Sequence, residues 1–326
     1  NVSEFMWAKE ASWDLVWISF PAVAGGGNGL CVSQNLVDAY RMQNGMDINE
    51  PGSGYPDPSE AWKPIGGNGK TFSNYQLSSQ VAKMYDNREM RFYASIVFNY
   101  CYREASSYTG TAANNKNFYQ TFYKDSPFGA WSDYPNDKSF SGYNCIKYCH
   151  PSDKPGNGGT VRSKYFPLIR YAEVLLNYVE AMNEMEGSYT DNEHNVTVSR
   201  DPAEMVKYFN MIRYRAGLPG ITLADAANKT KMRELIKRER QVEFALEGRR
   251  FYDLRRWGEL QRTMADPFIV MNVDARSNEP QKFYTRTVSS YQYSLFNITN
   301  KQCLYPIMQR RIDKNPNLDQ NPGWEK

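Results

Sequence analysis

The sequence predicts a mainly helical fold that carries a large loop-rich, irregular portion and few short strands. Three segments within residues 166–262 combine helical periodicity with start and stop signals. Residues 46–165 are instead dense in glycine, proline, asparagine, serine and aromatic residues, which favour loops. Antiparallel helix pairs at this spacing are typical of tetratricopeptide-like architecture, although no 34-residue repeat is legible. We therefore expect one region in four parts: an N-terminal segment (1–45), a loop-rich portion that binds the ligand (46–165), a helical portion (166–262) and a C-terminal tail (263–326).

The N-terminal segment predicts one short helix. Residues 1–24 are apolar and aromatic without a strict period, which indicates an extended or mixed segment leading into a flexible loop at 25–29. Ser33 can then cap a helix that stops by Gly45. The apolar face of this helix would hold Leu36, Val37 and Tyr40.

Within the loop-rich portion, residues 91–100 are rich in strand-forming residues but alternate poorly. They predict a buried strand or a short hairpin. The remainder of this portion is expected to be loops, which commonly carry functional surface.

The helical portion predicts three helices. Pro167 suits the first turn of a helix that runs to Met185 and stops at Gly187. The segment 201–204 reads as a capping box with proline at the first helical position, and it opens a helix that ends at 217–219. The third helix begins at Thr222 or Asp225, runs to Gly248 and resumes through 253–257.

Composition excludes several classes of partner. The chain has 326 residues, and its 39 basic residues nearly balance 36 acidic ones, for a net charge of +3. No block of like charge is present, so neither nucleic acid nor an anionic membrane surface is favoured as a partner. No apolar run reaches the roughly 18 residues that a membrane-spanning helix needs. These properties are those of a globular protein with a sizeable core.

Catalytic and metal chemistry have no positive support in the sequence. The chain has two histidines, neither in a motif, and its glycine runs lack the lysine and hydroxyl of a phosphate-binding loop. Acids are plentiful, but no pair is singled out for glycoside hydrolysis. Cys145 and Cys149 lie beside His150, and structural thiols or a single bridge are preferred there over zinc. We expect no enzyme activity, no cofactor and no metal.

The segment 233–257 is the most specific motif. It interleaves arginine and lysine with glutamate at three- and four-residue offsets along an apolar row. Its residue order resembles the C-terminal signature of the SusD/RagB family, surface lipoproteins of Bacteroidota that capture nutrients, mostly glycans, for a TonB-dependent transporter of the SusC type. Four further segments fit the same pattern in the expected order, namely 85–93, 166–181, 212–219 and 304–324.

The resemblance implies a SusD-like helical scaffold and a non-enzymatic function. The chain would bind a glycan or oligosaccharide on the extracellular face of the outer membrane and deliver it to a SusC-like transporter. Capture of peptides or protein fragments is the alternative, and a glycosidase domain is the third reading. Family members usually carry a longer N-terminal half and a lipidated cysteine, so we expect that an upstream half is absent here. Membrane contact would then be made through an upstream lipid anchor only.

Aromatic residues supply the candidate ligand-binding site. They make up 14% of the chain, with 24 tyrosines and 7 tryptophans. Such rings suit stacking on sugars, although they also fill irregular folds. In the SusD/RagB family the binding loops lie away from the C-terminal helices, and the equivalent region here is about 55–150. Candidates there are Trp62, Asn74, Tyr75, Tyr102, Tyr108, Trp131, Asp133 and Tyr134, with Arg103, Tyr123, Asn136 and Tyr143 as further candidates.

The leading candidate site is Trp131 together with Tyr134 and Asp133. These residues lie between the turn-forming segments 127–129 and 135–136, where burial of a tryptophan is less automatic than in a helix. The charged residues that match the family signature are expected to hold helices together instead. Glu243 and Arg250 are expected to pin the helix break near Gly248. The other residues of this structural set are Glu173, Arg213, Arg215, Glu239, Arg249, Asp253 and Arg255.

Overall fold

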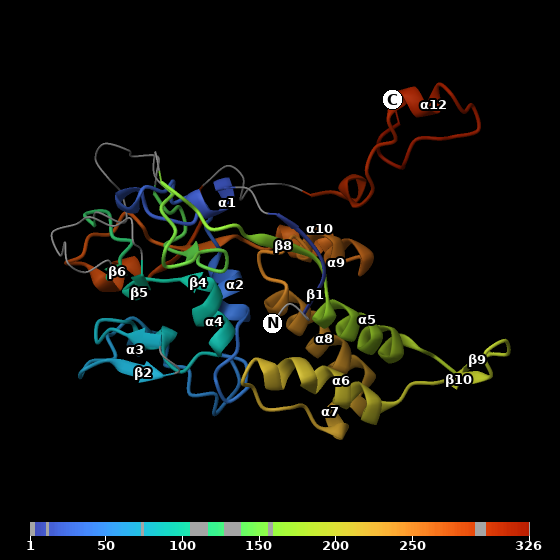
Figure 1. Ribbon diagram of the computed structural model, residues 1–326, viewed down its shortest axis with the longest axis horizontal. Helices are drawn as coiled ribbons and strands as arrows, with labels where there is room; N and C mark the ends of the chain where they lie inside the picture. The colour runs from blue at the N-terminus through green and yellow to red at the C-terminus, as the bar shows by residue number, and fades with distance from the viewer. Residues whose placement is uncertain are drawn as a thin grey trace.

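The computed structural model describes residues 4–10, 13–72, 75–104, 117–126, 138–155, 159–290 and 298–325. The predicted fold class is confirmed, because helices dominate one part of the molecule and the other part consists of loops with short helices and strands (Figure 1). Its strands form one four-stranded sheet and several two-stranded pairs.

The helical portion is a layer of packed helices. It contains α5 (Tyr171–Glu184), α6 (Pro202–Arg215), α7 (Leu223–Ala227) and α8 (Lys229–Glu243). Helix α5 packs against both α6 and α8. Leu176, Val179, Phe209, Met232 and Ile236 are among the side chains at the centre of this layer, each at most 1% exposed. These side chains recur at helical spacing, so each helix buries one apolar face in the layer.

The caps of these helices follow the sequence signals. The carboxylate of Asp201 accepts hydrogen bonds from the backbone N–H groups of Ala203 and Glu204, and Pro202 opens α6. Thr222 and Asp225 form a capping box at the start of α7. The third predicted helix is split, because the side chain of Asn228 caps a separate helix, α8.

Two predicted elements are corrected. Pro167 does not open a helix. It lies in β8 (Tyr165–Arg170), which pairs antiparallel with β1 (Phe5–Glu10), and α5 begins only at Tyr171. A two-stranded ribbon tolerates proline because one edge of each strand needs no donor. Residues 91–100 are not mainly strand, because α4 (Met90–Ser95) precedes the two-residue strand β4 (Ile96–Val97).

The loop-rich portion has its own aromatic core. Ser33 caps α2 (Gln34–Ala39) as predicted, since its hydroxyl accepts a hydrogen bond from the Leu36 N–H at 3.2 Å. The four-stranded sheet has the order β2-β3-β5-β6, with β2 (Lys70–Phe72), β3 (Tyr75–Leu77), β5 (Cys101–Glu104) and β6 (Asn117–Gln120). Strand β4 pairs with β7 (Asn144–Cys145). The core rings include Tyr40, Tyr85, Phe92, Phe98, Tyr143 and Phe283, each less than 1% exposed.

The remaining elements connect or extend these two portions. They are α1 (Trp13–Trp17), α3 (Pro58–Ala61), β9 (Tyr189–Asp191), β10 (Val196–Val198), α9 (Arg250–Arg256), α10 (Leu260–Ala265), β11 (Ile269–Met271), α11 (Pro280–Phe283), β12 (Arg286–Val288) and α12 (Gln309–Ile312), with three short 3-10 helices at 22–24, 83–85 and 300–303. Residues 269–288 return to the loop-rich portion, because Met271 and Phe283 belong to its core. Residues 300–305 contact α9 and α10, since Arg255 donates to the Cys303 carbonyl and lies over the Tyr305 ring. The chain around α12 then extends away from the body of the molecule (Figure 1).

All five cysteines are free thiols, so Cys145 and Cys149 are not bridged. Among the described residues, no cluster of three or more histidine, cysteine, aspartate or glutamate side chains is arranged to hold a metal ion. The helices of the described segments include none with the length and apolarity needed to span a bilayer.

Candidate ligand-binding pocket

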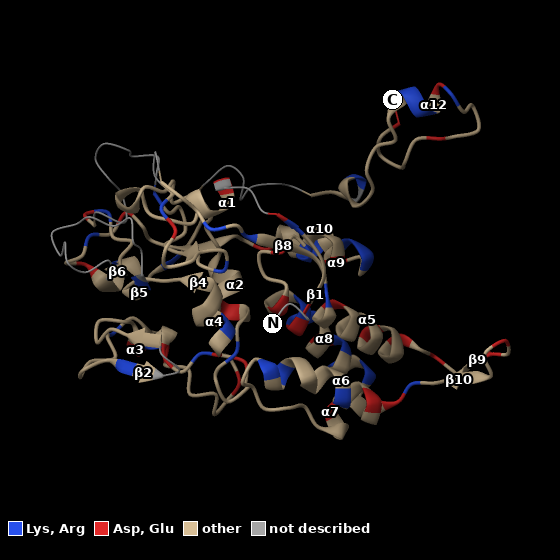
Figure 2. Cartoon of the chain, in the orientation of Figure 1, with Lys and Arg blue, Asp and Glu red and all other residues tan. Residues whose placement is uncertain are grey.

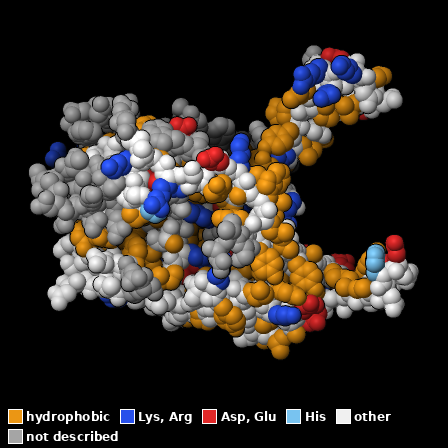
Figure 3. All heavy atoms as spheres, viewed as in Figure 1, with side chains coloured by type: hydrophobic (Ala, Val, Ile, Leu, Met, Phe, Trp, Pro, Cys, Tyr) orange, Lys and Arg blue, Asp and Glu red, His pale blue; other side chains and the backbone are white. Residues whose placement is uncertain are grey.

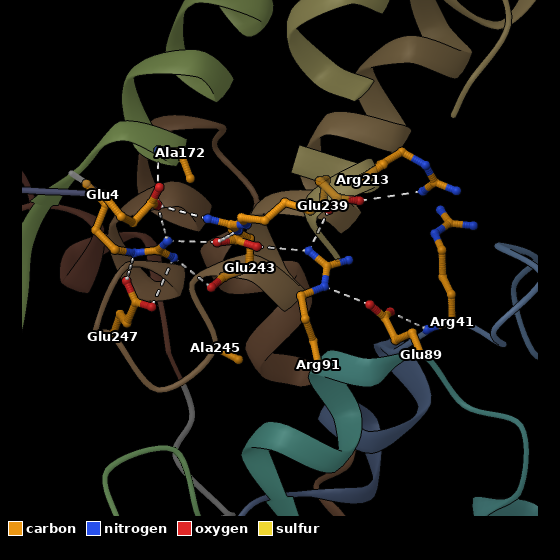
Figure 4. Close-up of polar contacts among 12 residues, drawn as sticks. Glu4, Arg41, Glu89, Arg91, Ala172, Arg213, Glu239, Glu243, Ala245 and Glu247 are labelled. Carbon is orange, nitrogen blue, oxygen red and sulfur yellow. Dashed lines mark hydrogen bonds and ion pairs between the residues drawn. The ribbon is translucent and has the colours of Figure 1, made fainter. Parts of the chain in front are cut away.

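The charged residues of the 233–257 segment form a buried ion-pair network rather than a binding surface. Glu243 accepts hydrogen bonds from Arg170 at 2.7 Å, from Arg91 at 3.0 Å and from Arg215 (Figure 4). Glu239 accepts a second bond from Arg91 at 2.6 Å. Both carboxylates are at most 5% exposed. The network therefore joins α8 to α4, to α6 and to β8, as the structural reading of these residues predicted.

The electrostatic state of Glu243 follows from this arrangement. Burial by itself would raise the pKa of its carboxyl group, but the guanidinium groups of Arg170, Arg215 and Arg91 outweigh burial and hold the pKa well below its usual range. Glu243 is therefore ionised at neutral pH. Along the helices, basic and acidic residues are interspersed (Figure 2).

The predicted partnership of Glu243 with Arg250 is wrong. The helix break between α8 and α9 is bridged by Arg240, which donates to both oxygens of Asp253 at 2.9 Å each. Arg250 instead lies with its guanidinium group 6.0 Å from the centroid of the Trp257 ring. The chain turns at the break through left-handed backbone conformations at Leu246 and Gly248, with φ of 65° and 74°.

A pocket with the chemistry of a ligand site lies in the loop-rich portion, beside α3. Its volume is about 580 Å³. Its floor includes Ile48, Met84 and Tyr284. The remaining lining residues are Asn49, Tyr55, Pro56, Asp57, Pro58, Ala61, Trp62, Gln281, Thr285 and Arg286. We refer to it as the Trp62 pocket.

Local structure holds the Trp62 ring at this pocket. Pro58 at the first position of α3 starts a single helical turn, and Trp62 follows at its C-terminal end. Backbone hydrogen bonds from Ile65 to Val81 and from Lys83 to Lys63 then anchor the chain directly after the ring. The tryptophan is half-buried, which leaves part of its ring available to a ligand.

The polar wall of the pocket is supplied by Arg286. Its guanidinium group donates to both oxygens of Asp38, at 2.8 and 3.1 Å, and to the Tyr55 hydroxyl at 3.4 Å. Burial opposes the charged form, yet the Asp38 carboxylate keeps the pKa of Arg286 above its usual value. A bidentate pair of this kind fixes the orientation of the guanidinium plane.

The lining suits binding rather than hydrolysis. Trp62, Tyr55 and two prolines offer apolar faces, while the exposed Asn49, Gln281 and Thr285 offer amide and hydroxyl groups. Among the lining residues that the structure describes, Asp57 is the only carboxylate. Glycosidases of the two-carboxylate type need a second acid across the scissile bond.

Of the predicted site residues, Trp62 lines this pocket and two others lie elsewhere. Tyr75 is on β3, with its ring 5.0 Å from that of the buried Tyr93, and burial raises its pKa well above the usual value. Tyr102 is on β5, opposite Tyr119 of β6 at a ring separation of 5.8 Å. The other candidates, Asn74, Tyr108, Trp131, Asp133 and Tyr134, lie outside the described residues, as does Asn136.

Three of the further candidates belong to the core. Tyr123 and Tyr143 are at most 2% exposed, and Arg103 is 1% exposed with its guanidinium group 4.7 Å from the Phe20 ring centroid. These assignments to a ligand site are therefore corrected. The sequence reasoning missed Tyr55 and Arg286, because nothing in the sequence indicates that residues 281–286 lie against residues 48–62.

Comparisons with known proteins agree with the architecture. The model of the SusD family matches residues 15–324. A SusD-like protein P2 from Formosa agariphila is 30% identical over 135 residues, which is 40% of this chain and 24% of that protein.

Solved structures share the fold over nearly the whole chain. The structure of BT4246 has a TM-score of 0.75 at 23% identity and covers 98% of this chain. A SusD-like carbohydrate-binding protein from Bacteroides fragilis NCTC 9343 has a TM-score of 0.60 at 20% identity and covers 97% of this chain. The chain spans 50% and 54% of the lengths of these two proteins.

Proposed function

Because the chain belongs to the SusD family, we propose that it binds a glycan or oligosaccharide at the cell surface without catalysing its hydrolysis. The bound sugar would be handed to a SusC-like TonB-dependent transporter. The protein would act on the extracellular face of the outer membrane, held there by a lipid anchor upstream of the residues described here.

The Trp62 pocket is the observation that carries this proposal. A pyranose ring has one face of C–H groups and a rim of hydroxyl groups, so its site needs a flat apolar surface beside directed donors and acceptors. The half-buried Trp62 ring offers the first, and the oriented Arg286 with the exposed amides of Asn49 and Gln281 offers the second. The similar structure from Bacteroides fragilis is that of a carbohydrate-binding protein, which supports the same ligand class.

The proposal is tested by measuring retention of the purified protein on a panel of plant, host and microbial polysaccharides, with release of reducing sugar recorded alongside. We expect retention by at least one polysaccharide and no sugar release. Hydrolysis would overturn the non-enzymatic reading. Binding of peptides with no retention by any polysaccharide would replace glycan capture by peptide capture.

Substitution of the tryptophan tests the pocket itself. Trp62→Ala is expected to weaken binding of the retained glycan about tenfold or more, which corresponds to roughly 1.4 kcal/mol. Trp7→Ala is the matched control, because Trp7 is 63% exposed on β1 and does not line this pocket. Equal glycan affinities for the two variants would show that the Trp62 pocket is not the glycan-binding site.

A further inference from the structure

A second and larger pocket lies between the two portions of the molecule. Its volume is about 700 Å³, and it is bordered by β1, β8, α4, the end of α8 and the segment 147–150. In the space-filling view, Lys and Arg side chains surround a hollow near the middle of the displayed face (Figure 3). We refer to it as the basic pocket.

The lining of this pocket contains twice as many basic as acidic residues, and most of the basic ones form ion pairs with acids. Its lining includes the basic residues Arg91, Lys147, Arg162, Lys164, Arg170 and Arg215, and the acidic residues Glu4, Glu243 and Glu247. Glu243 and Glu247 are at most 5% exposed, and both accept hydrogen bonds from Arg170. By contrast Arg162 is exposed and the side chain of Arg215 is 43% exposed. Among the described residues Arg162 forms no ion pair, so its guanidinium group is the positive charge that a ligand in this pocket can reach.

A buried carboxylate organises the rim. Asp153 is 0% exposed, and it accepts hydrogen bonds from the Lys164 ammonium group at 2.9 Å, the Arg162 N–H at 3.0 Å and the His150 N–H at 2.7 Å. The Lys164 ammonium group also donates to the Arg162 carbonyl at 2.9 Å. These contacts fix the backbone from which Arg162 projects, so that the basic rim is held in place before any ligand binds.

The pocket also offers apolar faces. Tyr165 is 61% exposed and Phe5 is 40% exposed, and both line it. Exposed rings can pack against the C–H face of a ligand, and the cations beside them can bind its negative groups. Sugars that carry carboxylate or sulfate groups have both features, and arginine binds either group in a planar, two-point geometry.

We propose that the basic pocket binds an acidic sugar unit of the glycan, through an anionic substituent that contacts Arg162 and Lys164. This inference rests on the proposed glycan-binding function and names the chemical class of its ligand. The Trp62 pocket would then bind neutral parts of a chain, while the basic pocket selects for carboxylated or sulfated ones.

The test compares three kinds of oligosaccharide at matched length: a galacturonate oligomer, a sulfated galactan oligomer and a neutral xylan oligomer. Affinities are measured by calorimetry for the wild-type chain and for Arg162→Gln, Arg162→Lys and the control Arg310→Gln, whose exposed arginine lies on α12. We expect at least one acidic oligomer to bind, with about tenfold weaker affinity in Arg162→Gln. Arg162→Lys should retain only part of the affinity, because lysine keeps the charge but not the two-point geometry, and Arg310→Gln should retain all of it. The two acidic oligomers distinguish a carboxylate from a sulfate ligand.

Affinity for the acidic oligomer that is equal in Arg162→Gln and in the wild type would overturn the inference. Binding of neutral oligomers alone would also overturn it, while leaving the proposed glycan function standing. Absence of binding to all three oligomers, together with no retention on the polysaccharide panel, would overturn both. A rise in salt concentration should weaken binding of the acidic oligomer and leave binding of the neutral one nearly unchanged.

Discussion

Glu243 is a buried carboxylate that binds three arginines and joins the two portions through Arg91. Its carboxylate lies between Arg170, Arg91 and Arg215, which come from β8, α4 and α6. A carboxylate in this position is costly to bury unless its charge is compensated. The glutamate and its three arginines are therefore one structural unit rather than independent surface pairs.

We predict that Glu243→Gln lowers the free energy of unfolding by about 2–3 kcal/mol at pH 7, because it removes the one carboxylate charge that all three arginines share and leaves them only their other acidic partners, Glu4, Glu89, Glu239 and Glu247. The pKa of Glu243 is depressed in the folded state, so its contribution is complete above the ordinary carboxyl pKa of 4.5 and is lost as the pH falls below that value. Denaturant unfolding at pH 7 and at about pH 3.5 measures both effects.

The stability difference between wild type and Glu243→Gln should therefore shrink in acid. Glu193→Gln is the control, because Glu193 is an exposed acid in the turn between β9 and β10. A difference that stayed constant or grew between the two pH values would show that Glu243 is not held ionised by its arginines.

At the scale of elements, the ion pair between Arg240 and Asp253 bridges the connection between α8 and α9. Arg240 is 4% exposed and Asp253 is 3% exposed, and their two hydrogen bonds span the non-helical residues 244–249. Arg250 carries the same charge as Arg240, but the contact described for it is with the Trp257 ring. Substituting Arg240 and Arg250 separately therefore tests which of the two stabilises the break between α8 and α9.

We predict that Arg240→Ala lowers the free energy of unfolding by about 2–3 kcal/mol and Arg250→Ala by about 1 kcal/mol or less. The reason is that only the first substitution removes two charge-assisted hydrogen bonds from the buried Asp253, which keeps the side chain of Arg256 as a partner. Chemical denaturation of both variants measures the two effects. Equal losses of stability would contradict the assignment of Arg240 as the residue that bridges the break.

Helix caps are features that the local sequence predicts correctly. Ser33, Asp201 and the Thr222–Asp225 pair cap helices as their sequence context predicts, because a cap needs only neighbours two or three residues away. The predicted helix start at Pro167 is wrong, because the conformation of this residue is determined by the pairing of β8 with β1, some 160 residues earlier in the chain. Proline signals are compatible with a helix start and with an edge strand alike.

At the scale of the whole molecule, the end of the helical portion packs into the core of the loop-rich portion. Val242 and Ala245, at the end of α8, pack in the aromatic cluster that contains Phe92 and Phe98. The ion-pair network crosses the same boundary through Arg91. We therefore expect the two portions to unfold together rather than as separate units.

Thiol reactivity tests this expectation. Burial raises the pKa of both Cys101 and Cys145 to about 12, so that neither thiol should react in the folded protein. In a denaturant titration, labelling of these thiols should coincide with loss of the helical circular dichroism signal. The fully unfolded chain, with all five free cysteines labelled, provides the reference. Thiol exposure at lower denaturant than helix loss would show that the loop-rich portion unfolds on its own.

The sequence by itself determined the fold class, the helical layer, most of its caps and the structural role of the charged signature. These depend on local periodicity and on contacts within a turn or two of helix. Tertiary structure alone decided which partner each charged residue has and which aromatic rings are accessible. The Trp62 pocket requires residues 48–62 and 281–286 to meet, and the buried Tyr143 and the half-buried Trp62 have equally amphipathic side chains. Whether an aromatic ring is buried depends on residues far away along the chain, and the local sequence does not identify those residues.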